Sequence, residues 1–178
     1  MSSQSSKHLD WCLRKAEKEL EECKKQKKKL RHRGLRKIEA NQKLALEHIN
    51  KARHYLKALQ LLRKQGFSDI AVSMGFYSLY HCFLAIGTRF GYESKNQTCT
   101  IALIESLQEE GRISLKPEII EYMKYEEEQN DRDNSVIELR EDYTYGVDLE
   151  VRNKDQLDRI EKLCIDLLDA TAGIIQKN

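Results

Sequence analysis

Apolar residues near the start of the chain recur at alternating spacings of four and three. This stripe predicts an amphipathic helix over about residues 5–32 that packs against one other helix. Lys27 lies within the stripe and weakens the packing of its distal half, and Gly34 is expected to end the helix. The stripe consists of Leu9, Leu13, Ala16, Leu20, Cys23, Lys27 and Leu30.

Two further helices are predicted after this segment. The first covers about residues 41–65 and is expected to end at Gly66. Ser68 is the expected N-cap of the second, over about residues 69–90, whose apolar side chains cover every side. Such a helix must be buried. The apolar face of the first consists of Ala45, Ile49, Ala52, Leu56 and Leu59.

The second of these helices contains 19 successive residues without a formal charge, from Ile70 to Thr88. That length is sufficient for a membrane span. Its serines, glycines, mid-helix tyrosines and His81 would be costly in lipid, however, and the sequence offers no second span to satisfy them. We therefore expect no membrane association, and we place this segment at the centre of a soluble bundle.

The second half of the chain has weaker patterns. Helices are predicted near residues 98–110, ended by Gly111, and from Pro117 into the acidic stretch at 126–128. Residues 130–152 are expected to be irregular, residues 153–176 form a last helix, and no strand is predicted. The sequence thus predicts an all-α protein, with an up-and-down helical bundle of about five helices over residues 41–178 and an extra N-terminal basic helical extension over residues 1–40.

The composition agrees with a single helical domain. The 178 residues include 1 proline and 8 glycines, 40% are hydrophobic and 34% are charged, which excludes disordered, collagen-like and turn-rich all-β chains. The five cysteines form no CxxC pair, and their odd number does not fit the disulfide framework of a small secreted protein. The N-terminus has no apolar stretch of the signal-peptide type. We expect a cytoplasmic protein in a reducing compartment.

Charge is distributed unevenly along the chain. Residues 1–64 contain 19 Lys and Arg against 7 Asp and Glu, whereas residues 93–150 contain 6 against 16. The basic half is either a phosphate-binding face or a solvated face turned toward its own acidic partner. The lysine-rich run at 24–29 has the same two interpretations, and a solvated helix face is the commoner one.

Motifs for cofactors are absent from the sequence. There is no GxGxxG, no Walker A sequence, no HExxH and no Cys/His cluster at ligand spacing, so no cofactor and no metal site is predicted. His81 is the only histidine within the apolar helix, and it is either a hydrogen-bonded core residue or a titrating site residue. Cys82 points about 100° away from it around the helix, so the two cannot act together as nucleophile and base.

The densest group of polar residues lies at 138–146, before the last helix. Arg140 offers a planar fork of donors for phosphate oxygens, and Tyr143 and Tyr145 add phenolic donors and π faces for a base. The alternative is that Arg140 pairs with a neighbouring carboxylate, at Glu138, Glu141 or Asp142, while both tyrosines pack against the bundle.

The order of these features resembles the HEPN family, the higher eukaryotes and prokaryotes nucleotide-binding domains. An amphipathic helix ends in Gly66-Phe67, the run DIAVSMGFYSLYH follows at 69–81, then come an acidic middle, the Arg140 to Tyr145 segment and an amphipathic last helix. The resemblance covers about residues 41–177, and its most specific parts are residues 69–83 and Arg140 to Tyr145.

The HEPN resemblance implies a helical bundle that dimerises and brings an Arg-x4-6-His motif from each subunit to a shared cleft. Active members are metal-independent ribonucleases, in which the histidine moves protons and the arginine stabilises charge on the phosphate. Arg140 matches that arginine and Glu141 the polar residue after it, but Tyr145 stands where the histidine is expected. Small HEPN proteins of this kind are often paired with a minimal nucleotidyltransferase as toxin and antitoxin.

Three hypotheses follow. In the first, the chain is a homodimer that binds RNA, a nucleotide or a nucleotidyltransferase through Arg140, Glu141, Tyr143, Tyr145 and His81, with no need for catalysis. In the second, it is a ribonuclease in which Arg140 acts with Tyr143, Tyr145 or His81. In the third, it is a structural interaction protein that assembles through the N-terminal heptad stripe.

Overall fold

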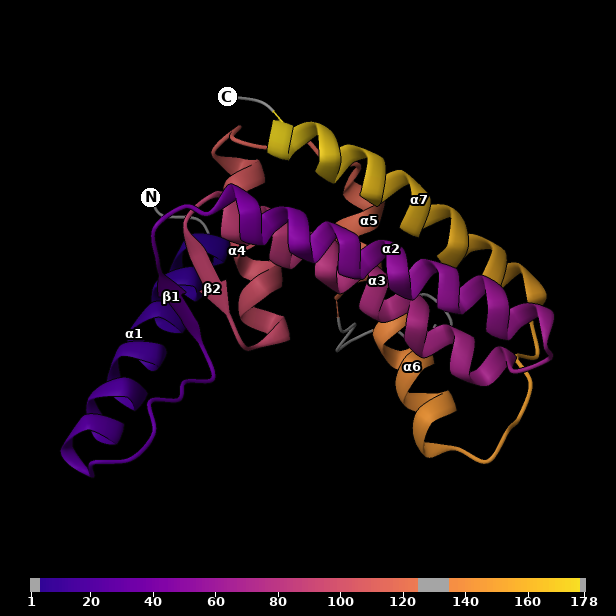
Figure 1. Cartoon of the computed structure of the whole chain (residues 1–178), viewed down its shortest axis with the longest axis horizontal. Helices are drawn as coiled ribbons and strands as arrows, with labels where there is room; N and C mark the ends of the chain where they lie inside the picture. The colour runs from indigo at the N-terminus through magenta and orange to yellow at the C-terminus, as the bar shows by residue number, and fades with distance from the viewer. Residues whose placement is uncertain (1–3, 125–134, 177–178) are drawn as a thin grey trace.

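Three long helices form the body of the molecule, and they lie side by side along its longest axis (Figure 1). The computed structural model describes residues 4–124 and 135–176. The predicted all-α helical bundle is confirmed. The three long helices are α2 (Gln42–Lys64), α3 (Ser68–Arg89) and α7 (Lys154–Gln176).

α3 is the central helix, as its apolar sequence predicts. It is long and apolar enough to cross a membrane, yet 61% of its most apolar stretch is buried within the protein. Gly75 allows the close packing of this helix, because a Cβ there would lie 2.2 Å from Ile160 Cγ2 of α7 and 3.0 Å from Leu59 Cδ1 of α2. Only a residue without a side chain fits between these neighbours.

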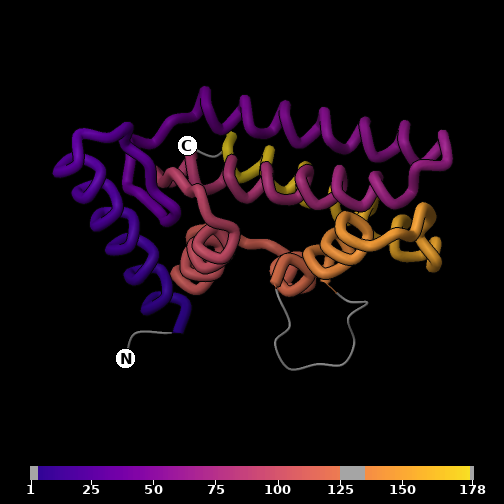
Figure 2. Tube along the Cα trace, turned by 90° about the horizontal axis from the view of Figure 1, so that it is seen from below, coloured from indigo at the N-terminus to yellow at the C-terminus, as the bar shows by residue number. Residues whose placement is uncertain are grey.

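The other helices pack around this body. Three of them lie on one side of α3, with α4 toward one end of the molecule and α6 toward the other (Figure 2). α1 packs beside α4, so it is at the end far from α6. The acidic stretch predicted at 126–128 lies outside the described residues. These helices are α1 (Gln4–Lys25), α4 (Gln97–Glu109), α5 (Pro117–Tyr122) and α6 (Val136–Tyr145).

Helix ends were predicted well where glycine sets them. Gly66 and Gly111 follow α2 and α4 with φ values of 83° and 68°, as expected for C-terminal stops. The prediction for α1 was wrong, because this helix ends at Lys25 instead of continuing to Gly34. Ser68 is the first residue of α3 and not its N-cap, and its Oγ accepts a hydrogen bond from Val151 N at 2.8 Å.

Two short strands attach the N-terminal part to the bundle, although no strand was predicted. β1 (Leu35–Lys37) and β2 (Tyr92–Ser94) pair antiparallel, with Arg36 opposite Glu93. Three residues are too few for a visible alternation of polar and apolar positions. We refer to residues 4–37, which contain α1, the following loop and β1, as the N-terminal arm.

The N-terminal arm also folds back closely on itself. A Cβ on Gly34 would lie 2.5 Å from the carbonyl oxygen of Cys12 and 3.1 Å from Ala16 Cβ. Glycine is therefore needed at position 34 for the chain to pass directly against α1, which is a packing role and not the helix stop that was predicted.

A disulfide joins the N-terminal arm to the bundle. It links Cys12 of α1 to Cys99 of α4, with a Cα–Cα distance of 5.7 Å and both side chains fully buried. Cys23, Cys82 and Cys164 are free thiols. The sequence analysis did not anticipate this pair, because it interpreted the odd number of cysteines as the pattern of a reducing compartment, where disulfides are rare. The 87 residues between the two cysteines gave no sign that α1 packs on α4.

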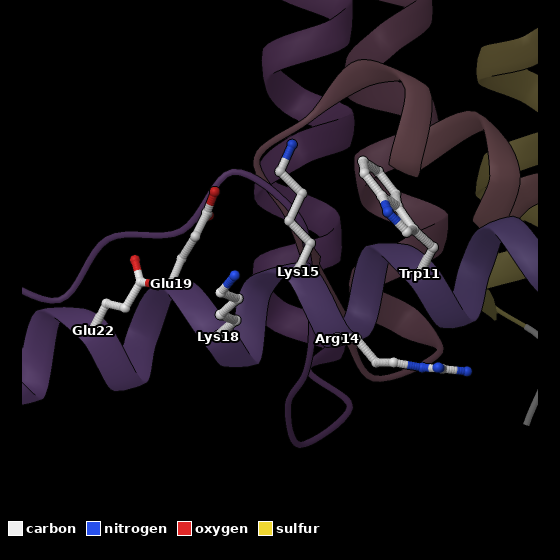
Figure 3. A pocket seen from close by; sticks show the side chains of 6 residues that line it. All are labelled: Trp11, Arg14, Lys15, Lys18, Glu19 and Glu22. Carbon is white, nitrogen blue, oxygen red and sulfur yellow. The ribbon is translucent and has the colours of Figure 1, made fainter.

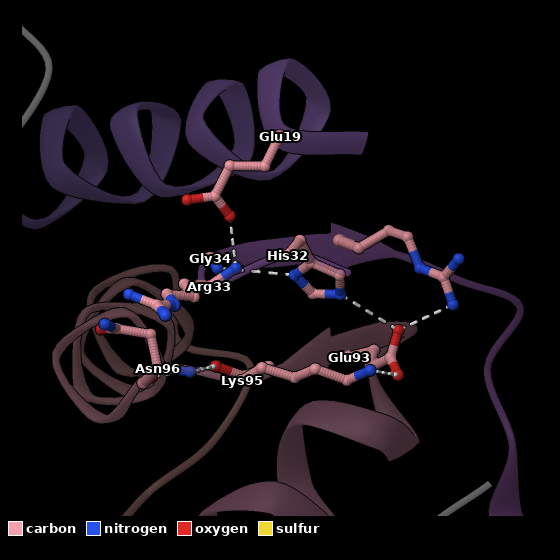
Figure 4. A network of polar contacts seen from close by, with 9 residues as sticks. Glu19, His32, Arg33, Gly34, Glu93, Lys95 and Asn96 are labelled. Carbon is pink, nitrogen blue, oxygen red and sulfur yellow. Dashed lines mark hydrogen bonds and ion pairs between the residues drawn. The ribbon is translucent and has the colours of Figure 1, made fainter. Parts of the chain in front are cut away.

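A polar network reinforces the strand pair (Figure 4). His32 is buried, and its Nδ1 accepts a hydrogen bond from Gly34 N, so its Nε2 donates to Glu93 Oε2 at 3.4 Å. Arg36 and Lys95 also pair with Glu93, at 2.7 and 3.4 Å. Burial raises the pKa of Glu93, but the hydrogen bond from His32 and the two cations outweigh it and lower that pKa overall.

Candidate nucleic-acid interface

The segment that was expected to be irregular contains a helix, α6. Ser135 caps it by accepting a hydrogen bond from Ile137 N at 3.3 Å, and its hydroxyl donates to Lys124 O at 2.6 Å. The buried residues Val136, Ile137 and Leu139 hold α6 against α3. The helix was missed because its apolar residues are confined to the first turn and charged residues follow them.

Arg140 of α6 lies against the aromatic surface of α3. Its guanidinium carbon is 4.3 Å from the centre of the Phe76 ring, and one of its nitrogens is 3.2 Å from Glu141 Oε1. The side chain is 19% exposed. Arg140 therefore makes the carboxylate pair foreseen as the alternative, together with a cation–π contact that was not foreseen. The remaining donors of its fork are what a phosphate would use.

The two predicted tyrosines do not join Arg140. The Tyr143 hydroxyl accepts a hydrogen bond from Arg152 N at 3.1 Å, and the ring packs against the core. Tyr145 is 83% exposed at the end of α6. Five residues separate it from Arg140, so the two side chains leave the helix about 140° apart. A site shared by Arg140 and Tyr145 within one subunit is therefore not formed.

His81 lies beside a second histidine that the sequence analysis did not place in the site. The Nδ1 atoms of His48 and His81 are 3.0 Å apart, which requires one ring to donate and the other to accept. Burial, together with the proximity of His48 and Lys51, lowers the pKa of His81 to about 4. Burial also lowers the pKa of His48, against an opposing contribution from Glu47. Both rings are therefore neutral at pH 7, and His81 is hydrogen-bonded but half-buried.

Tyrosine rings continue this surface across α2 and α3. The Tyr55 ring stacks on His81 with centroids 5.5 Å apart, and it lies 5.3 Å from the Tyr77 ring. Lys51 Nζ is 5.0 Å from the centre of the Tyr55 ring. Tyr55 is partly exposed and Tyr77 is exposed. Tyr77, at 37% exposure, is the ring of this group with the most surface open to a base of a nucleic acid.

The ring contacts connect His81 to Arg140. Phe76 meets Tyr77 edge-on with centroids 5.3 Å apart, and Phe76 is the ring on which Arg140 lies. One continuous group of rings therefore runs from α2 over α3 to α6, with Arg140 on the Phe76 ring at one end and Lys51 on the Tyr55 ring in the middle. We call this group the aromatic row. It consists of His48, His81, Tyr55, Tyr77 and Phe76.

The opposite side of α6 has a different character. A surface pocket there is lined by residues that include Asp142, Tyr143, Asp148 and Arg152. Arg152 is already paired with Asp148 at 2.9 Å. Two carboxylates disfavour a phosphate in this pocket. Of the two sides of α6, the one with Arg140 is the better match to an anionic ligand.

The free cysteines and the metal-binding residue types do not form a second candidate site in the described part of the chain. Cys82 and Cys164 are buried, and burial raises the pKa of both thiols, that of Cys164 to about 12. Neither is a thiolate at neutral pH. Over residues 4–124 and 135–176, no group of three or more His, Cys, Asp or Glu side chains is arranged to hold a metal ion.

Sequence reasoning identified Arg140 and His81 but missed the residues that connect them. His48 and Tyr55 are seven positions apart, with Lys51 between them, which places all three on one side of α2. That spacing could have predicted a shared face of α2 with these three side chains. A comparison with known proteins adds no further assignment, because no family model and no curated protein matches this chain.

Proposed function

We propose that the chain is a HEPN-like helical protein that binds single-stranded RNA or a nucleotide on the aromatic row. The observation that supports this is the continuous series of rings between Lys51 and Arg140. Bases stack on tyrosine faces irrespective of sequence, while the flanking cations attract phosphates. Arg140 thus keeps the role expected from the resemblance, with Tyr77 and Tyr55 in place of Tyr145.

The residues around Arg140 favour binding of RNA without its cleavage. A ribonuclease of the HEPN type needs a proton donor and a proton acceptor beside the phosphate. His81 is neutral at pH 7, so it is a poor acid, and Tyr145 leaves α6 in another direction from Arg140. Cleavage remains the second hypothesis, since a neutral imidazole can still accept a proton.

The assembly expected from the resemblance belongs to the same proposal. A homodimer would bring a second Arg140 to the shared cleft, and a minimal nucleotidyltransferase would be the protein partner in the cytoplasm. Light scattering of the purified chain tests the dimer directly. A monomeric mass at micromolar concentration would remove the shared cleft but leave binding by one aromatic row possible.

The binding proposal is tested by fluorescence anisotropy with a labelled single-stranded RNA of about 20 uridines. We expect Arg140→Ala and Tyr77→Ala each to weaken binding by about 1–3 kcal/mol, because they remove a charge-assisted contact and a stacking face. Tyr145→Ala is the matched control and should bind as the unaltered chain does. Circular dichroism verifies that each variant keeps its helices.

The same titration separates the hypotheses. If Arg140→Ala and Tyr77→Ala bind RNA with unchanged affinity, the aromatic row is not the site. Incubation with EDTA tests catalysis, because cleavage that persists in EDTA and disappears in Arg140→Ala would identify a metal-independent ribonuclease. A dimer that neither binds nor cleaves RNA would favour the structural interaction protein.

A further inference from the structure

The loop after α1 is the most strongly charged exposed segment of the N-terminal arm. Residues 24–33 contain seven Lys and Arg and no Asp or Glu, and all except His32, Gln26 and Leu30 in this range are cationic. Every residue in the range is exposed apart from His32. Lys24 and Lys25 belong to the last turn of α1, where the helix dipole stabilises positive charge. The five cations beyond the helix have no such local explanation.

The loop has a defined backbone. Lys28 N donates to Cys23 O at 2.9 Å and Lys27 N donates to Lys24 O at 3.1 Å, the two bonds that close a helix with a residue in the left-handed region. Lys27 is that residue, with a φ of 52°. Cys23 Sγ donates to Arg31 O at 3.6 Å. These contacts hold the start and the end of the loop beside the end of α1.

The loop cations are not neutralised by the rest of the described chain. Over residues 4–124 and 135–176, no ion pair involves a Lys or Arg side chain between Lys24 and Arg33, where only His32 meets a carboxylate, that of Glu93. Arg63 and Lys116 elsewhere each have a carboxylate partner. The charge pattern also allowed the basic residues to face an acidic part of the same chain. The described acidic residues do not pair with the Lys and Arg side chains of this loop. The loop keeps a concentrated positive charge that faces water.

An exposed tryptophan lies on the same arm. Trp11 is 54% exposed, and Lys15 Nζ lies 4.9 Å from the centre of its ring. Trp11 and Lys15 rise from the same side of α1 (Figure 3). They line a surface pocket with Arg14, Lys18, Glu19 and Glu22, so its two carboxylates direct phosphate contacts to the loop and leave the pocket to the Trp11 ring. A tryptophan beside basic residues offers a stacking face next to phosphate partners.

The structure favours a nucleic acid over a membrane as the occupant. A helix that lies on a membrane needs a free apolar face. The apolar stripe of α1 is already used, because Cys12 and Ala16 are buried and Leu9 and Leu13 pack against the core. What remains exposed is Trp11 among charged residues, followed by an irregular cationic loop in which Leu30 is the one exposed apolar side chain, so no continuous apolar face is left.

We propose that the N-terminal arm is a second RNA-binding surface, on which the loop at 27–33 contacts phosphates and Trp11 stacks on a base. The inference rests on the proposed function and specifies its substrate class. The arm and α6 are at opposite ends of the molecule (Figure 2), and α3 rises about 20 Å from Phe76, which Arg140 contacts, to its end at Arg89. A mononucleotide cannot reach both surfaces, so the substrate is extended single-stranded RNA.

The test is the salt dependence of binding to the RNA of about 20 uridines, measured for the full chain and for Lys28→Gln/Lys29→Gln/Arg31→Gln. Loss of three phosphate contacts should make the slope of log K against log salt shallower by about 2, with affinity reduced roughly a hundredfold near 0.1 M salt. The matched control is Lys64→Gln/Lys154→Gln/Lys162→Gln, three exposed lysines of α2 and α7. It should change affinity by less than about threefold.

Trp11 supplies a direct readout, because it is the only tryptophan of the chain. Titration with the same RNA should quench its fluorescence with the affinity found by anisotropy, and Trp11→Phe should retain most of the binding that Trp11→Ala loses. Unchanged emission at saturation would exclude contact between RNA and this surface.

The outcomes for the arm and for the aromatic row are distinguishable. An unchanged slope in the loop variant, with binding still weakened by Tyr77→Ala, would overturn the arm proposal and leave the proposed function standing. The reverse result would support the arm and overturn the aromatic row. If the full chain binds no RNA at low salt, both fail. If the loop variant loses binding only to vesicles of anionic lipid, the arm is a membrane contact and the proposal is wrong.

Discussion

At the scale of single residues, the pair of His48 and His81 makes the stability of the fold depend on pH. Burial lowers the pKa of His81 from 6.5 to about 4. Between these two values the unfolded chain carries a proton on this residue and the folded chain does not. The contribution of His81 to the free energy of unfolding is therefore fully present above pH 6.5, and it is lost as the pH falls toward 4.

We expect His81→Gln to reduce this pH dependence. The free energy of unfolding of the unaltered chain should fall from pH 6.5 to pH 4, and that of the variant should fall less, because one proton uptake on unfolding is removed. Urea denaturation at a series of pH values measures the difference. His54→Gln, at an exposed position of α2, is the control and should keep the dependence of the unaltered chain. Superimposable curves for all three proteins would contradict the prediction.

Lys27 carries a backbone cost that glycine would not. Its φ of 52° is in the left-handed region, which disfavours residues with a side chain. Lys27→Gly should stabilise the closed end of α1 by about 0.5–1 kcal/mol, measured as the opening free energy of α1 amides in native-state hydrogen exchange. Lys28→Gly, one position later and without a positive φ, should give no such gain.

At the scale of elements, the packing of the N-terminal arm depends on one close approach. Gly34→Ala places a Cβ 2.5 Å from the Cys12 carbonyl oxygen, so the strand entry must move away from α1. We expect a loss of about 1–3 kcal/mol in the free energy of unfolding, measured with urea.

Gly173 provides the matched control for that substitution. It lies within α7, and a Cβ there meets nothing within 4 Å. Gly173→Ala should therefore stabilise the protein by about 0.5–1 kcal/mol, because alanine loses less backbone entropy in a helix. A loss of stability in both variants would indicate that the close approach at Gly34 is not the cause.

The elements also show how far the sequence could predict the fold. α2, α3 and α7 were predicted to within a residue or two, since each carries a long apolar pattern with defined ends. α6 and the two strands were missed because ten and three residues are too short for such a pattern. α1 was drawn too long because its apolar spacing continues through Lys27 and Leu30, while the backbone turns at Lys27.

The candidate site was predictable in its parts but not in its arrangement. Arg140 was found through its residue type and its resemblance to a motif, and His81 through its apolar surroundings. Tyr145 was chosen from its position in the motif, and the spacing alone did not show that it leaves α6 about 140° away from Arg140. The contacts of Phe76 with Arg140 and of Tyr55 with His81 join different helices, and local sequence holds no information on such pairings.

At the scale of the whole molecule, the Cys12–Cys99 link couples the N-terminal arm to the bundle. Cross-linking residues 87 positions apart restricts the unfolded chain by an amount worth about 4.6 kcal/mol. In Cys12→Ala/Cys99→Ala, hydrogen exchange should become faster throughout α1, because the arm can open on its own. Amides at the centre of α3 should remain slower than those of α1. Cys23→Ala, which removes a free thiol of the same helix, should leave the exchange of α1 unchanged.

The same link closes residues 12–99 into a covalent ring, and the basic loop is an exposed, non-helical part of that ring. Trypsin cuts after lysine and arginine, so it should nick this loop before the buried helices. One nick would open the ring but would not divide the molecule, since the two pieces stay joined through sulfur. The nicked protein should therefore run as one band on a gel without reductant and as two bands after reduction, with the smaller piece carrying Trp11.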